Sequence, residues 1–179
     1  GLVDVYKRQI YDTPISESLP QLASLITRHD LPIGLMRRVL NANFNLSSTT
    51  AIQNIVSITS DQSVAMAIRL EALSILRSWP KPSGRDRITG LWRPLKPVLK
   101  SQVAHLVQPT LASLIQDPDP QIQQSAILMA GDLSLAFSVD ALTSLLRNHD
   151  NPPLHRQLAV TSLTKINPPK LLQILRTVI

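Results

Sequence analysis

The sequence predicts an all-α protein, an α-solenoid of stacked helix pairs, on the basis of three observations. Hydrophobic residues make up 44% of the 179 residues, which is enough to form a folded core. Aromatic residues make up only 3% and glycines number only 5, which disfavours β-sandwiches and β-barrels. The third observation is an internal repeat of about 32 to 33 residues in which apolar residues recur at helical spacing.

The repeat is defined by one small or apolar anchor position in each of four segments. The anchors are Leu40, Ala72, Ala126 and Ala159, which are 32, 54 and 33 residues apart. We expect all four anchors to be buried between neighbouring helix pairs, because a single pair cannot bury its apolar stripe alone. Since the middle spacing exceeds the others by about 21 residues, we interpret residues 79–100 as a long loop inserted into the regular period.

A shorter apolar helix and a polar turn precede each anchor helix, so the repeating unit is a pair of helices. Aspartate in the turn, or proline in the first helical turn, marks the start of the second helix of each pair. We therefore expect about four and a half repeats. The expected helices span residues 17–28, 33–44, 49–59, 63–78, 101–116, 120–136, 139–147, 153–165 and 169–178.

These helix pairs, with aspartate in the turn and arginine three positions before the anchor, resemble HEAT repeats over residues 16–179. The resemblance implies that arginine and aspartate side chains bond across neighbouring repeats in a ladder. The candidate members of this ladder are Arg37, Arg69, Arg156, Asp30, Asp61 and Asp150. Gln123 occupies the arginine position of the third repeat, so we expect the ladder to be interrupted there.

An independent argument concerns Arg69, which lies at the edge of the apolar stripe of its helix. A buried arginine without a partner would destabilise the fold by several kcal/mol. We therefore expect this arginine to lie near a turn aspartate or a turn carbonyl. The alternative is a side chain that runs along the surface and places its charge in water.

The inserted loop carries the main charge asymmetry of the chain. The net charge of +6 equals the charge of the segment from Arg77 to Lys100, so the rest of the chain is neutral. Prolines and glycines in this segment exclude a long helix, and its apolar residues argue against a solvated linker. The expected buried anchors are Trp79 and Trp92, and the expected positive docking surface is Arg85, Arg87, Arg93 and Lys96. A solvated run of charges that keeps the loop soluble is the alternative.

No residue pattern in the sequence indicates catalysis, a cofactor or a metal. The chain has no cysteine, which excludes disulfides, thiolate zinc sites and iron–sulfur clusters. The 4 histidines show no HExxH spacing, and neither a GxSxG nor a phosphate-binding glycine motif occurs. His155 stands at an apolar position of the repeat, so we expect a partly buried, hydrogen-bonded histidine. No apolar run approaches the ~18 residues that a membrane-spanning helix requires.

Residues Pro82–Leu95, which read PSGRDRITGLWRPL, resemble a string found in large exported bacterial proteins of the membrane-bound dehydrogenase type. Those proteins combine a β-propeller akin to quinone-dependent sugar dehydrogenases, a HEAT-repeat middle and a C-terminal c-type cytochrome domain. The resemblance implies a non-catalytic scaffold and docking segment of such a redox protein, located in the periplasm or outside the cell. No catalytic or haem-binding residue of that family has a counterpart in this chain.

Two other functions are alternatives to this interpretation. One is a cytoplasmic HEAT-type adaptor that binds other proteins. The other is a nucleic-acid-binding helical repeat, in which basic residues would contact phosphates and tryptophans would stack on bases. Because the excess basic residues are confined to one loop, the sequence favours a protein partner, either an acidic protein or a neighbouring domain of the parent chain.

The two ends of the chain suggest a fragment. The string DVYKRQ near the start resembles a translated sequencing adapter, so we expect residues 1–9 to be a non-native tail with few contacts and the solenoid to span residues 10–179. A natural N-terminal tail is the alternative. The chain starts without methionine and stops within an apolar periodic stretch, so we expect it to be open at both ends.

Overall fold

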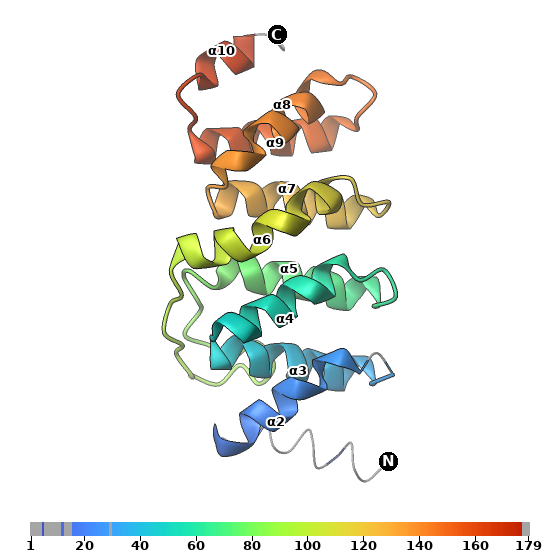
Figure 1. Ribbon diagram of the computed structural model, residues 1–179, viewed down its shortest axis with the longest axis vertical. Helices are drawn as coiled ribbons and strands as arrows, with labels where there is room; N and C mark the ends of the chain where they lie inside the picture. The colour runs from blue at the N-terminus through green and yellow to red at the C-terminus, as the bar shows by residue number, and fades with distance from the viewer. Residues whose placement is uncertain (1–4, 6–11, 13–15, 29, 177–179) are drawn as a thin grey trace. The chain divides into compact units, whose positions relative to one another are not determined.

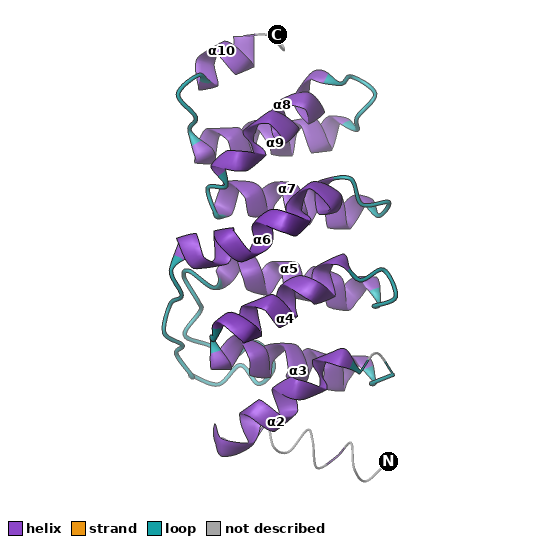
Figure 2. Cartoon of the chain, in the orientation of Figure 1, coloured by secondary structure: helices purple, strands orange, loops and turns teal. Residues whose placement is uncertain are grey.

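The described part of the chain is all-helical, as the composition and the repeat predicted. The computed structural model describes Val5, Asp12, residues 16–28 and residues 30–176, so the expected tail 1–9 lies outside the described residues except for Val5. Figure 2 shows helices and loops and no strand in these residues. The contacts divide the chain into two compact units, Gly1–Leu99 and Lys100–Ile179.

The first unit contains two helix pairs followed by a long loop. Its elements are η1 (Ser16–Ser18), α2 (Leu19–Ala23), η2 (Ser24–Thr27), α3 (Ile33–Leu46), α4 (Thr49–Ser60) and α5 (Met66–Ser78). Figure 1 shows α2 and α4 on one side of this unit and α3 and α5 behind them. The expected single helix 17–28 is three short segments instead. At its centre Ser24 Oγ donates to the Gln21 carbonyl (2.8 Å), and such side-chain bonds compete with helical backbone geometry.

The second unit continues the same pattern of paired helices. Its elements are α6 (Lys100–Ile115), α7 (Pro120–Asp132), η3 (Ala136–Ser138), α8 (Val139–Arg147), α9 (Pro153–Ile166) and α10 (Leu171–Arg176). The Asp119 side chain caps α7 by accepting from the backbone N–H groups of Gln121 (2.8 Å) and Ile122 (3.2 Å). The helix expected over 120–136 ends at Asp132, because Ser134 adopts the left-handed conformation with φ 51°.

The repeat anchors lie in the cores of the two units. Leu40, Ala72, Ala126 and Ala159 are all 0% exposed, which confirms the alignment of the repeats. The helices α7 and α9 approach so closely that a Cβ on Gly131 would lie 2.8 Å from the Cα of Ser162. The glycine and the serine at this contact therefore allow α7 and α9, the second helices of neighbouring pairs, to approach through their backbones.

The helix that precedes the long loop ends differently from the other second helices. A left-handed residue follows α3, α7 and α9, namely Ser47 (φ 51°), Ser134 (φ 51°) and Asn167 (φ 52°). Such a residue stops a helix and turns the chain into the next element. At the end of α5, Trp79 keeps right-handed helical angles (φ −58°, ψ −38°), and the chain runs on into residues 79–99.

Candidate docking loop

Trp79 holds the base of the docking loop, which comprises residues 79–99. The side chain is 0% exposed, and its ring meets the ring of Phe44 edge to face with centroids 5.3 Å apart. Its Nε1 donates to Ser47 Oγ (3.0 Å), so this tryptophan joins the ends of α3 and α5. The Trp79 carbonyl accepts from the backbone N–H of Val98 (3.3 Å), which brings the two ends of the loop together.

Residues 84–93 form a hairpin inside the loop. The backbone N–H of Arg93 donates to the Gly84 carbonyl (2.9 Å), and the N–H of Asp86 donates to the Leu91 carbonyl (2.8 Å). Arg85 and Trp92 form an isolated antiparallel bridge between these two bonds. The hairpin is therefore held together by hydrogen bonds within its own backbone.

Asp86 organises the tip of this hairpin. Its Oδ1 accepts from the backbone N–H groups of Ile88 (2.9 Å) and Thr89 (2.7 Å) and from Thr89 Oγ1 (2.9 Å). The Asp86 carbonyl accepts from the N–H of Gly90 (3.0 Å), whose φ of 71° suits glycine and strains other residues. The single acidic residue of the basic segment thus has a structural role in the turn.

Trp92 is exposed, so the prediction that it is a buried anchor is wrong. The side chain is 72% exposed, and the neighbouring Leu91 is also exposed. A Cβ on Gly84 would overlap the six-membered ring of Trp92, so the indole ring covers the bare backbone of this glycine. Cross-strand pairing, rather than burial in the helices, decides where the ring lies. Composition alone does not reveal the hairpin that this pairing creates.

Arg87 is turned towards the helices, which corrects the expectation that it projects outward. Its Nη2 donates to Ser74 Oγ (2.9 Å) and its Nε lies 3.3 Å from Glu71 Oε1. Arg93 is half-buried and donates from Nη2 to the Asp12 carbonyl (2.9 Å). The arginines of the segment therefore do not form one outward patch.

The groups left on the outside of the loop are a mixture of apolar and basic side chains. Arg85 and Lys96 are exposed, and the Arg85 Nη1 donates to the Gly90 carbonyl (3.1 Å). Together with the exposed Leu91 and Trp92 they form what we call the docking surface. It combines two cationic groups with an exposed indole ring that lies on the backbone of Gly84.

Glu71 is a residue whose role sequence reasoning missed. Its side chain is 14% exposed; Oε1 faces Arg87 and Oε2 accepts from Nε of Arg37 (3.3 Å). It therefore joins α3, α5 and the hairpin tip. The expectation that Arg37 pairs with a turn aspartate is wrong, because the Glu71 carboxylate is its partner. A signal was present, since Glu71 and Ser74 share one polar helix face in the sequence.

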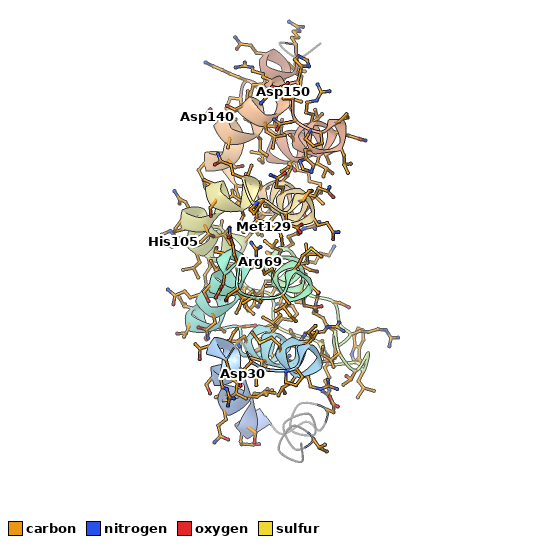
Figure 3. The ribbon with its side chains drawn as sticks, turned by 90° about the vertical axis from the view of Figure 1, so that its right-hand side faces the viewer. Asp30, Arg69, His105, Met129, Asp140 and Asp150 are labelled. Atoms are coloured by element: carbon orange, nitrogen blue, oxygen red, sulfur yellow. The ribbon has the colours of Figure 1, made fainter. Side chains whose placement is uncertain are left out.

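The other arginines of the expected ladder differ in their surroundings. Arg69 is 5% exposed, and its Nε donates to the Thr59 carbonyl (2.9 Å) in the last turn of α4 (Figure 3). The Arg156 Nη1 lies 3.1 Å from Nδ1 of His149, so its partner is a turn histidine rather than an aspartate or carbonyl. Its buried Nε has no hydrogen-bond partner among the described residues.

The three turn aspartates bond to nearby groups of their own turns. Asp30 lies 2.6 Å from the Arg28 Nη2, and Asp61 Oδ1 accepts from the backbone N–H (2.9 Å) and Oγ (2.6 Å) of Ser63. The backbone N–H of Asp150 donates to Asn148 Oδ1 (3.0 Å). The Asp30 carboxylate is thus already paired with Arg28 in its own turn, which supplies a physical reason why Arg37 has another partner.

His105, His149 and His155, the histidines that the structure describes, do not gather into a metal site. His155 is buried, and its Nε2 lies 3.3 Å from the amide nitrogen of Gln124 on α7. Within the described residues, no group of three or more histidine or acidic side chains could hold a metal ion. The same part of the chain has no helix with the length and hydropathy needed to cross a bilayer.

Substituting Gly84→Ala will displace the Trp92 ring with little effect on the stability of the fold. The new methyl group occupies the place of the indole, which is exposed and can swing away. We expect the free energy of unfolding to change by less than about 1 kcal/mol. The indole N–H resonance of Trp92 should shift while that of Trp79 stays unchanged. Unchanged resonances of both indoles would contradict the contact between Trp92 and Gly84.

Comparison with known proteins supports the repeat assignment. Residues 107–179 match the family of HEAT repeats. No curated protein and no solved structure matches the chain. Stacked helical repeats of this kind typically present extended surfaces for protein interaction and are typically not catalytic. Residues 107–179 are thus similar to HEAT repeats, which supports a HEAT-repeat segment there and suggests a protein-interaction scaffold.

Proposed function

We propose that the chain is a non-catalytic docking segment of a larger exported redox protein and that its docking surface binds an acidic protein partner. The observation that carries the docking proposal is the exposed Trp92, whose ring lies on Gly84 and whose bridge partner Arg85 is also exposed. The redox parent and the export rest on the resemblance of residues Pro82–Leu95 to the dehydrogenase-type proteins.

The composition of the docking surface fits protein recognition. Tryptophan and arginine are the residues most often responsible for the binding energy of protein interfaces. Trp92 is already positioned by the hairpin, so a partner need not supply the free energy of ordering it. Cationic groups beside it would attract an acidic surface over a distance and so raise the association rate.

A cytoplasmic adaptor would bind an acidic protein through the same docking surface. The sequence that flanks this segment in its gene distinguishes the two settings. A β-propeller upstream and a CxxCH haem-attachment sequence downstream support the redox parent. Flanking sequence that lacks both features rules it out and leaves the adaptor.

Substituting Trp92→Ala will weaken binding to the adjoining domains of the parent chain, produced separately and measured by calorimetry. Loss of a central aromatic side chain typically costs about 2 kcal/mol or more of binding free energy. Arg85→Glu should slow association, and the effect should fade at high salt. We leave Arg87 unchanged, because a glutamate there would face Glu71 and destabilise the hairpin.

Two variants serve as matched controls for this experiment. Leu172→Ala removes an apolar side chain that is also 72% exposed, and Lys170→Glu reverses an exposed charge. Both lie in the second unit, outside the docking surface. Equal losses of affinity in the controls and in the docking variants, or none in either, would refute the assignment of the surface. Salt-sensitive binding of single-stranded DNA that requires Trp92 would favour a nucleic-acid partner instead.

A further inference from the structure

The second unit contains a polar groove between α6, α8 and the start of α7. Its volume is about 490 Å³, and none of the described residues that line it is charged. Four carboxamide side chains converge on it, from Gln116, Gln123, Asn148 and Asn151. In a chain with a net charge of +6, an uncharged surface with four carboxamides indicates a ligand that is itself uncharged but rich in hydrogen-bonding groups.

The groove coincides with the irregular member of the repeat. Gln123 occupies the position that Arg37, Arg69 and Arg156 occupy in the other helix pairs. In the second repeat, the guanidinium of Arg69 lies at the end of α4 and bonds to the Thr59 carbonyl. Glutamine is shorter and neutral, so the corresponding position of the third repeat has both free space and no charge.

Two of the carboxamides are fixed in complementary orientations. The Nδ2 of Asn151 donates to the Leu145 carbonyl (2.9 Å), which leaves its Oδ1 as an acceptor. The Oδ1 of Asn148 accepts from the backbone N–H of Asp150 (3.0 Å), which leaves its amide nitrogen as a donor. One donor and one acceptor held three residues apart match the two groups that every peptide unit presents.

We propose that this groove binds the main chain of an extended, uncharged polypeptide segment of a partner protein. The carboxamides pair with peptide N–H and C=O groups, and Ile115 and Leu145 contact small apolar side chains. A segment with charged side chains is disfavoured, because the groove would desolvate a charge without supplying an opposite one. The proposal concerns the second unit alone and stands independently of the docking surface in the first unit.

The test is a titration of the whole ¹⁵N-labelled chain with a peptide of alternating alanine and threonine, blocked at both ends. We expect saturable shifts of the side-chain amide resonances of the four carboxamides, since recognition of the main chain does not depend on peptide sequence. Peptides in which glutamate or lysine replaces threonine should give no saturable shift. An absence of saturable shifts with the neutral peptide, or equal binding of the charged peptides, would overturn the proposal.

The variant Gln123→Arg restores the arginine of the other repeats and fills the groove. It should weaken binding of the neutral peptide by roughly tenfold or more. Gln121→Arg adds the same charge at an exposed position of α7 that does not line the groove, and it should bind normally. Because an arginine at position 123 could disturb the fold, Gln116→Ala removes one carboxamide without adding volume and should also weaken binding. Normal binding by both groove variants would refute the site.

Discussion

Replacing Arg69 by alanine will lower the free energy of unfolding by about 1.5–3 kcal/mol, the range typical of losing a hydrogen bond from a charged group. The side chain is 5% exposed, and its Nε donates to the Thr59 carbonyl at the end of α4. The substitution leaves this carbonyl without its charged donor and opens a cavity between helices α4 and α5. The loss is measured by urea denaturation followed by circular dichroism.

Arg77→Ala is the matched control for this variant. Arg77 lies on the same helix, in its last turn, and is half-buried rather than buried. Charges at such positions typically contribute about 1 kcal/mol or less. Equal destabilisation by the two substitutions would show that Arg69 behaves as an ordinary surface residue.

Replacing Trp79 by alanine will also lower the free energy of unfolding by about 3–5 kcal/mol, because a large, fully buried side chain is removed. The substitution removes the contact with the Phe44 ring and the hydrogen bond to Ser47 Oγ. Since the same residue forms the base of the docking loop, we also expect the hairpin resonances to broaden. Urea denaturation followed by circular dichroism measures the first effect, and nuclear magnetic resonance the second.

Two further tryptophan variants separate burial from residue type. Trp79→Phe keeps an aromatic ring but loses the bond to Ser47, so it should destabilise less than Trp79→Ala. Trp92→Ala removes a side chain that is 72% exposed and should change the free energy of unfolding by about 0.5 kcal/mol or less. Similar losses for Trp79→Ala and Trp92→Ala would contradict the different roles assigned to the two tryptophans.

The sequence predicts the fold well because the same packing arrangement recurs in every helix pair. Each helix pair must bury one apolar stripe against its neighbours, so the same spacing recurs around Leu40, Ala72, Ala126 and Ala159. The burial of these four residues can therefore be predicted from the local periodicity of apolar residues. Helix ends were less predictable, because residues such as Ser134 stop a helix through a backbone conformation that serine adopts only rarely.

The candidate site was predicted less well because it depends on contacts distant in the sequence. Composition suggests the same role for Trp79 and Trp92. In the structure, Trp79 packs against Phe44 of α3, whereas Trp92 lies on the hairpin backbone at Gly84. The partner of Arg37 is Glu71, which is 34 residues away. Charge and repeat position identify candidate residues, whereas the choice among several available partners depends on three-dimensional distances.

The hydrogen bond between the Trp79 carbonyl and the Val98 N–H holds the two ends of the docking loop together, so the residues between them can be replaced as a unit. A chain whose two ends are already held together can change its length at small entropic cost, about 0.6 kcal/mol for each doubling. Mutation and recombination can therefore replace the hairpin tip while the helix pairs of the first unit stay intact. Homologous segments could diversify their partners in this way, and a foreign hairpin grafted between positions 80 and 97 would inherit the same rigid base.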